Sequence, residues 1–170
     1  EFKLSVQYRL TGRELSIVYF IENRSNKVMP FNFGLHPAFK CPLSEEENFS
    51  DYKVEFACPE KLNQFPKGNY TFEGREFNLD YSIFDEIPTY CFENVKSPYV
   101  TLTNGKHGVK VMVEGYRWLA FWTKKNAPYL CIEPWHSHGD FNEKTECIEF
   151  ADREGTLKLE PGRTFVTSYK

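Results

Sequence analysis

Apolar and polar residues alternate along the opening of the chain, which is the pattern of a strand with one buried face. The apolar positions of the first run are Phe2, Leu4, Val6, Tyr8 and Leu10, and those of a second run are residues 15, 17, 19 and 21. Thr11, Gly12 and Arg13 lie between the two runs, and a glycine in so short a connection is typical of a β-hairpin. Because the sequence starts inside a strand without an initiator methionine, we expect it to lack N-terminal strands.

Short runs rich in β-branched and aromatic residues continue to the C-terminus and are separated by turn residues. They cover residues 29–33, 52–56, 99–103, 109–113, 118–123, 145–150, 156–159 and 164–169. No stretch of a dozen residues has the apolar period of a helix, and the only helix candidate is a turn at residues 44–48. The pattern predicts an all-β fold, an antiparallel β-sandwich of two packed sheets, in a single domain spanning residues 1–170.

Composition excludes several functional classes without identifying one. A chain of 170 residues that is 41% hydrophobic and 17% aromatic is long enough for one packed core. The net charge of -3 is small and the Lys and Arg residues are dispersed, so we expect no nucleic-acid partner. The sequence has neither a long apolar run nor the features of a signal peptide, which predicts a cytoplasmic protein with no membrane partner.

The cysteines give no sign of a disulfide framework. There are five of them, at Cys41, Cys58, Cys91, Cys131 and Cys147. An odd number without a C-x-x-C pair argues against disulfides and against a structural zinc site. We expect reduced thiols, most of them in the core.

A stretch with chemical promise runs from Tyr129 to Asp140 and reads YLCIEPWHSHGD. Its apolar first half predicts a strand that ends at a kink at Pro134, so Glu133 comes where a buried strand stops. A partly desolvated carboxylate beside Trp135 suits proton transfer to a ligand of the size of a sugar. A glutamate held at the strand end by backbone amides or by a lysine is an equally good interpretation.

A second stretch with chemical promise runs from Pro30 to Pro42 and reads PFNFGLHPAFKCP. Pro37 favours an extended conformation at His36, which fixes the direction of the imidazole. Phe33 and Phe39 flank it as apolar walls. With an ordinary pKa of about 6.5, a positioned histidine is a natural proton donor near neutral pH. A core histidine bonded to a carbonyl oxygen is the alternative.

Together the motifs GLHPAF and CIEPWxxxGD resemble the paired signatures of the aldose 1-epimerase (galactose mutarotase) family, and most closely those of its LacX-like branch. The resemblance implies a galactose mutarotase-like β-sandwich, or supersandwich, that interconverts the anomers of a free aldohexose without a cofactor. It also implies the roles of the two candidate residues. His36 corresponds to the general acid that protonates the ring oxygen, and Glu133 to the general base that removes the proton of the C1 hydroxyl.

Further sugar contacts are expected around this pair. Trp135 is a candidate stacking platform, Phe33 a candidate apolar wall, and Asp140 either binds a sugar hydroxyl or orders its turn. The resemblance places an acidic sugar-binding residue near Asp85, although out of register. It also places Ala38 where many members of the family carry a tyrosine, so one hydroxyl contact to the sugar would be missing.

Two other functions fit parts of the sequence. A carbohydrate-binding or sugar-sensing module would keep the pocket without turnover. His136 and His138 form an H-x-H pair that, together with His36, would suit a cupin-like metal-dependent enzyme, but the order of its ligands is reversed. Since an incomplete sandwich exposes sheet edges and apolar surface, we also expect a homodimer or poor solubility.

Overall fold

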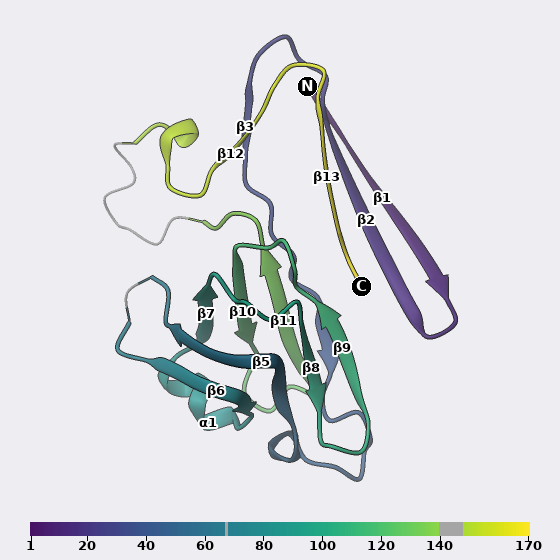
Figure 1. Cartoon of the computed structure of the whole chain (residues 1–170), viewed down its shortest axis with the longest axis vertical. Helices are drawn as coiled ribbons and strands as arrows, with labels where there is room; N and C mark the ends of the chain where they lie inside the picture. The colour runs from purple at the N-terminus through teal and green to yellow at the C-terminus, as the bar shows by residue number, and fades with distance from the viewer. Residues whose placement is uncertain (67, 140–147) are drawn as a thin grey trace. The chain divides into compact units, whose positions relative to one another are not determined.

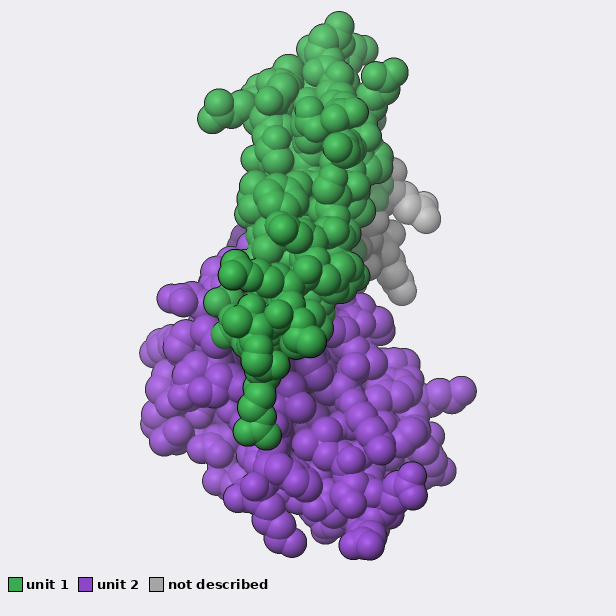
Figure 2. Space-filling model, turned by 90° about the vertical axis from the view of Figure 1, so that its right-hand side faces the viewer, with its two compact units in different colours: residues 1–33, 137–170 green, residues 34–136 purple. Residues whose placement is uncertain are grey.

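The computed structural model divides the chain into two compact units. It describes residues 1–66, 68–139 and 148–170. One unit joins Glu1–Phe33 with Ser137–Lys170, and the other is Gly34–His136 (Figure 2). This division is one of internal contacts, and a single domain spanning residues 1–170 stays a prediction.

Two four-stranded sheets carry the described part of the Gly34–His136 unit (Figure 1). The sheet with the order β4-β11-β10-β7, called here the β11 sheet, consists of β4 (Ala38–Lys40), β11 (Tyr129–Trp135), β10 (Trp118–Trp122) and β7 (Thr89–Glu93). The sheet with the order β6-β5-β8-β9 consists of β6 (Thr71–Asn78), β5 (Lys53–Asn63), β8 (Tyr99–Thr103) and β9 (Gly108–Met112). Neighbouring strands pair antiparallel in both sheets, as predicted.

The two sheets pack face to face through aromatic side chains. The ring of Phe121 on β10 lies 6.1 Å from that of Phe56 on β5 and 5.2 Å from that of Phe77 on β6, measured between centroids. Side chains alternate along a strand, so the even-numbered residues of β10 lie on the opposite face of the β11 sheet. We call this opposite face the outer face. The predicted β-sandwich is confirmed, and the outer face is where the candidate site lies.

The unit formed by the two ends of the chain is built on the predicted hairpin. β1 (Phe2–Thr11) pairs with β2 (Glu14–Asn23), which pairs in turn with β13 (Thr164–Tyr169). Gly12 has a φ of +60°, a conformation that the tight connection needs and that glycine adopts without strain. A second small sheet pairs β3 (Met29–Phe31) with β12 (Leu157–Leu159).

Several elements differ from the sequence prediction. β6 was not predicted, because its buried residues Phe72 and Phe77 are five positions apart and an irregular pairing with β5 interrupts the alternation. The helices in the described residues are α1 (Tyr81–Glu86) and the 3-10 turns η1 (Phe49–Asp51) and η3 (Phe150–Asp152). The helix candidate at residues 44–48 is a turn, in which the Glu47 N–H donates to the Ser44 carbonyl oxygen at 3.4 Å, and does not become a helix. α1 is too short to produce an apolar period.

The predicted strand at residues 145–150 is wrong where it can be tested. Residues 145–147 lie outside the described part of the chain, and Phe150 begins η3.

The cysteine prediction is confirmed for three thiols, since Cys41, Cys91 and Cys131 are buried and free. Cys147 lies outside the described residues. Among the helices that the structure describes, none has the length and apolar character that crossing a membrane requires.

Candidate active site on the outer face of the β11 sheet

Glu133 is placed by a strand that runs further than its sequence suggests. β11 does not stop at Pro134 but continues to Trp135, and Pro134 lies opposite Leu119 of β10. The pairing of β11 with β4 ends at Cys131, so the missing N–H of Pro134 falls beyond the paired stretch on that side. Glu133 therefore lies inside a strand, on the outer face of the sheet.

The segment that carries His36 lies alongside β11. The Leu35 N–H donates to the carbonyl oxygen of Pro134 at 3.1 Å, and the indole N–H of Trp135 donates to the Leu35 carbonyl oxygen at 3.1 Å. Gly34 makes an isolated bridge with Trp135, and a Cβ atom at this glycine would meet the indole at 2.6 Å. The glycine of the GLHP motif is thus required for close approach, which brings His36 beside Glu133.

The two side chains predicted to share the chemistry are in direct contact. Nδ1 of His36 lies 2.5 Å from Oε2 of Glu133. The side chain of His36 is 62% exposed, whereas that of Glu133 is 4% exposed. Oε1 of Glu133 is buried and has no hydrogen-bond partner in the described part of the chain. The pair therefore joins a solvent-facing imidazole to a buried carboxylate that retains a free acceptor.

Burial controls the proton affinity of this carboxylate. Desolvation raises the pKa of Glu133 above its usual value, and the hydrogen bond and charge of His36, with a smaller contribution from Trp135, act in the opposite direction. A carboxylate whose pKa is raised in this way accepts a proton more readily than an exposed glutamate does. Its environment thus favours the work of a general base.

Aromatic rings and thiols surround the pair. The ring of Trp122 lies 5.6 Å from that of His36, and the ring of Tyr129 lies 5.9 Å from that of Trp122. Neither aromatic residue was singled out from the sequence, although both occupy alternate positions that share a face with Glu133. Burial, and then the charge of Glu133, raise the pKa of the Cys131 thiol to about 12.

One group of described residues has ligand atoms close enough to hold a metal ion. Single donor atoms of His36, Cys131 and Glu133 lie within 4.8 Å of one another. The thiol would have to lose its proton to bind a metal, and its raised pKa opposes this. The H-x-H pair considered from the sequence does not form such a group with His36. Proton transfer by His36 and Glu133 is therefore the chemistry that this group suits best.

The other predicted site residues lie in different surroundings. Trp135 is half-buried on the outer face near the pair. Asp85 is on α1 and forms an ion pair with Lys125 at 2.7 Å. Phe33 belongs to the unit formed by the two ends of the chain, where its ring packs 5.2 Å from that of Tyr19. Asp140 lies outside the described residues.

The remaining histidines have local contacts. His136 packs against Tyr116 with ring centroids 4.2 Å apart, and burial lowers its pKa. His138 is buried, and its Nδ1 lies 2.6 Å from the carbonyl oxygen of Gly139. His107, to which the sequence analysis gave no role, contacts Glu47 and Tyr52. Among the contacts between described residues, the one between a histidine and a buried carboxylate is that of His36 with Glu133.

The fold is that of galactose mutarotase-like proteins. A galactose mutarotase-like protein from Lactobacillus casei ATCC 334 has a TM-score of 0.81 and 24% identity over 99% of this chain and 62% of its own. A galactose mutarotase related enzyme from Lactobacillus acidophilus has a TM-score of 0.84 and 22% identity over 99% of this chain and 60% of its own. At these identities the similarity establishes the fold.

The chain belongs to the aldose 1-epimerase family, whose sequence model matches residues 1–169. The chromosomal and the plasmid LacX proteins of Lactococcus lactis subsp. lactis are each 30% identical to it over 185 residues. These alignments cover 99% of this chain and 61% of each relative, so the chain spans less than two thirds of their length. The family membership expected from the two motifs is confirmed.

Proposed function

We propose that the protein is an aldose 1-epimerase that interconverts the α and β anomers of a free aldohexose, in the cytoplasm and without a cofactor. The observation that carries this proposal is the 2.5 Å contact between His36 and Glu133 on the outer face of the β11 sheet. Family membership supports the same reaction. The exposed imidazole and the buried carboxylate suit the two opposite proton transfers that ring opening needs.

Ring opening requires one proton to be given and one to be taken. Protonated His36 donates to the ring oxygen, and Glu133 accepts the proton of the C1 hydroxyl. The bond between C1 and the ring oxygen breaks, and C1 becomes the carbonyl carbon of the open-chain aldehyde. After rotation about the C1–C2 bond, the ring closes on the other face of the carbonyl and the two side chains exchange roles.

Within this proposal, each polar atom of the pair has a separate task. Nδ1 of His36 faces Glu133, so Nε2 is the nitrogen that remains for the sugar. Oε1 of Glu133, which lacks a partner among the described residues, is the natural acceptor for the C1 hydroxyl. Within this proposal Trp135 is the stacking platform, and Phe33, Asp85 and Asp140 stay candidates for sugar contacts.

Polarimetry of freshly dissolved α-D-glucose and α-D-galactose tests the proposal. We expect the protein to accelerate mutarotation and the Glu133→Gln and His36→Ala variants to lose about 100-fold or more of kcat/KM, since each removes one proton-transfer group. His107→Ala is a matched control, because this histidine also contacts a glutamate but lies outside the site. Sugar binding without any acceleration over buffer would refute the enzyme and identify a binding module.

A further inference from the structure

An imidazole, a thiol and a carboxylate meet on the outer face of the β11 sheet because of the strand register. β4 pairs with β11 up to Cys131, and the isolated bridge at Trp135 continues the same register. His36 therefore comes opposite Glu133 and diagonally next to Cys131. Cys131 is two residues before Glu133, so both side chains lie on the same face. Single donor atoms of these three residues lie within 4.8 Å of one another.

The spacing of the donor atoms is close to that of a zinc site. In a tetrahedral site the ligands lie about 2.0–2.3 Å from the ion, which puts neighbouring donor atoms about 3.3–3.8 Å apart. Nδ1 of His36 lies 2.5 Å from Oε2 of Glu133, so the imidazole must withdraw by about 1 Å to admit an ion. The His36 side chain is 62% exposed and can move towards the solvent. Movement of one exposed side chain is therefore enough to make room for the ion.

The donor set selects the class of ion. Imidazole, thiolate and carboxylate together suit zinc and similar divalent cations, whereas magnesium and calcium prefer oxygen ligands alone. Oε1 of Glu133 is buried and has no partner among the described residues, and a cation held by this carboxylate would compensate its buried charge. Three protein ligands leave the fourth position of a tetrahedral ion open, on the solvent side next to His36.

Proton release keeps such an ion exchangeable. On binding, the Cys131 thiol gives its proton to the solvent, and the ion replaces the proton between Nδ1 of His36 and Oε2 of Glu133. The imidazole keeps a proton on Nε2. Loss of the thiol proton is costly in this buried place, so we expect the ion to bind reversibly from solution rather than as a permanent part of the protein. This agrees with a reaction that needs no cofactor.

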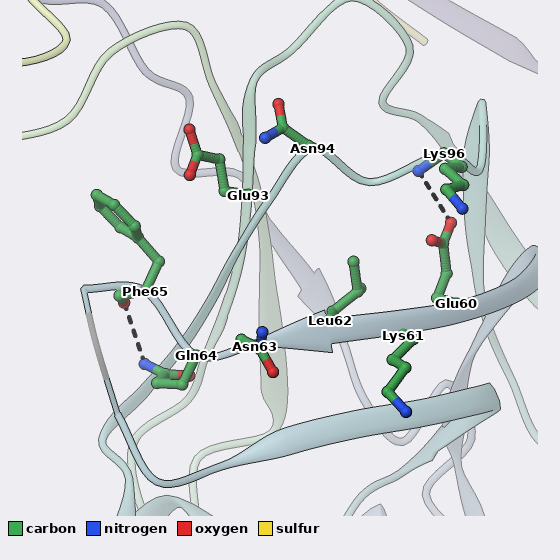
Figure 3. A pocket seen from close by; sticks show the side chains of 9 residues that line it. All are labelled: Glu60, Lys61, Leu62, Asn63, Gln64, Phe65, Glu93, Asn94 and Lys96. Carbon is green, nitrogen blue, oxygen red and sulfur yellow. Dashed lines mark hydrogen bonds between the residues drawn. The ribbon is translucent and has the colours of Figure 1, made fainter.

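A second buried glutamate shows that an unpartnered oxygen is not enough for a cation site. Glu60 is 4% exposed, and its Oε2 makes no hydrogen bond within the described residues. It also has a thiol nearby, since Sγ of Cys58 lies 3.8 Å from its Oε1. The pocket of about 310 Å³ beside it is lined by Lys61 and Lys96 and by no histidine among the described residues (Figure 3). Positive side chains repel a cation, so Cys58 and Glu60 provide a control.

We infer that His36, Cys131 and Glu133 form an inhibitory site for zinc and similar divalent cations. The ion occupies Nδ1 of His36 and an oxygen of Glu133, so neither side chain is free for proton transfer while the ion is bound. The inhibition rests on the proposed function, whereas the binding of the ion does not. Activity then falls as free zinc rises, and a chelator restores it.

Cobalt spectroscopy tests the site independently of activity. Co²⁺ bound to a thiolate has an intense charge-transfer band in the near ultraviolet, which hydrated Co²⁺ lacks, and added Zn²⁺ removes the band by displacement. We expect the band in the metal-free protein and its loss in Cys131→Ser and Cys131→Ala. Cys58→Ser is the matched control and should keep the band, because Cys58 also lies beside a buried glutamate but belongs to no group of three metal ligands in the described residues.

Calorimetry and polarimetry with Zn²⁺ complete the test. Glu133→Gln and His36→Ala should weaken zinc binding about 100-fold or more, since loss of a group that only supports a ligand already costs about 10–100-fold. In hexose mutarotation, the zinc concentration that gives half-inhibition should rise by a similar factor in Cys131→Ser. Each rate is compared with that of the same variant in the presence of a chelator.

The site and the proposed function fail in different ways. A protein that binds Co²⁺ through Cys131 without accelerating mutarotation refutes the epimerase and supports the site. The site is overturned if the folded protein gives no cobalt band, or if Cys131→Ser and Cys131→Ala bind zinc as tightly as the unmodified protein. Full mutarotation activity with zinc bound through Cys131 would overturn the inhibition. Matching unfolding temperatures of the metal-free proteins show that the variants are folded.

Discussion

Within the described residues, His36 and His107 each contact a glutamate, and the two contacts differ in almost every physical respect. His36 meets Glu133 on the outer face of a sheet, where the carboxylate is buried and desolvation raises its pKa. His107 meets Glu47 at 3.1 Å between two loops, where a hydrogen bond from the hydroxyl of Tyr52 lowers the pKa of the carboxylate. A His–Glu contact by itself is therefore no sign of a catalytic site.

The two pairs differ in the other hydrogen bonds that the carboxylates of Glu47 and Glu133 accept. Glu47 accepts hydrogen bonds from Tyr52 and from Asn104 besides its contact with His107, so its two oxygens are in use. Glu133 keeps one oxygen without a partner among the described residues. A fully satisfied cluster fixes loops in place, whereas a buried carboxylate with an unused acceptor is a costly arrangement that a ligand would complete. We therefore expect the His107–Glu47 pair to contribute to stability and the His36–Glu133 pair to the proposed function.

The largest contrast is expected between Glu133→Gln and Tyr52→Phe. The first should abolish mutarotation, as argued above, and leave the unfolding free energy nearly unchanged, because it removes a buried charge without removing volume. The second removes a buried hydroxyl that Glu47, His107 and the Leu43 N–H share. It should lower the unfolding free energy by about 1–3 kcal/mol and keep full activity.

Urea unfolding together with polarimetry measures both quantities. Tyr99→Phe is the control for the loss of a tyrosine hydroxyl, because no hydrogen bond of this hydroxyl occurs in the part of the chain described. An unstable but fully active Glu133→Gln protein, or an inactive and stable Tyr52→Phe protein, would reverse the roles assigned to the two clusters.

A smaller effect is expected from Gly34→Ala. The added Cβ would meet Cδ1 of Trp135 at 2.6 Å, so the His36 segment or the indole must shift. Misplacement of a catalytic group by a fraction of an ångström lowers turnover, and we expect kcat/KM for galactose to fall about tenfold. Sugar titration and circular dichroism separate this effect from unfolding. Unchanged activity in a folded Gly34→Ala protein would mean that the close approach to Trp135 does not position the histidine.

The sequence was sufficient for the fold class and for naming two side chains that the structure brings into contact, for reasons that particular residues make clear. Alternation at Phe2, Leu4 and Val6 gives a period of two that only a strand with distinct faces produces. His36 and Glu133 were found because each lies in a short motif with a proline that restricts the backbone. Both motifs are local, and local signals are what a single sequence retains.

What the sequence did not reveal depends on register or on cumulative burial. Pro134 lies inside β11 because β4 stops pairing at Cys131, which no local pattern indicates. Trp122 comes beside His36 only once β10 is aligned with β11. The pocket lined by residues 60–65 and by Glu93, Asn94 and Lys96 joins two segments about 30 residues apart. The Glu60 oxygen that has no partner among the described residues follows from burial rather than from residue type.

The smallest expected effect is on the pH dependence of stability. Ionisation of Glu133 should lower the free energy of unfolding, whereas ionisation of Glu47 should raise it. Burial raises the pKa of Glu133 in the folded protein, so its ionisation costs folding free energy and stability is lost as pH rises through that folded pKa. The hydrogen bond from Tyr52 lowers the pKa of Glu47, so its contribution is present above the unfolded pKa and is lost as pH falls through the folded one.

Thermal unfolding of Glu133→Gln and Glu47→Gln, followed from acid to neutral pH, measures how each carboxylate changes the stability of the protein with pH. Relative to the unmodified protein, the melting temperature of Glu133→Gln should rise with increasing pH, and that of Glu47→Gln should be lowest at neutral pH and recover in acid. Cys91 and Cys131 face Glu133, but their pKa values of about 12 keep them out of this range. Parallel melting curves for the two variants would mean that burial does not distinguish the catalytic carboxylate from the structural one.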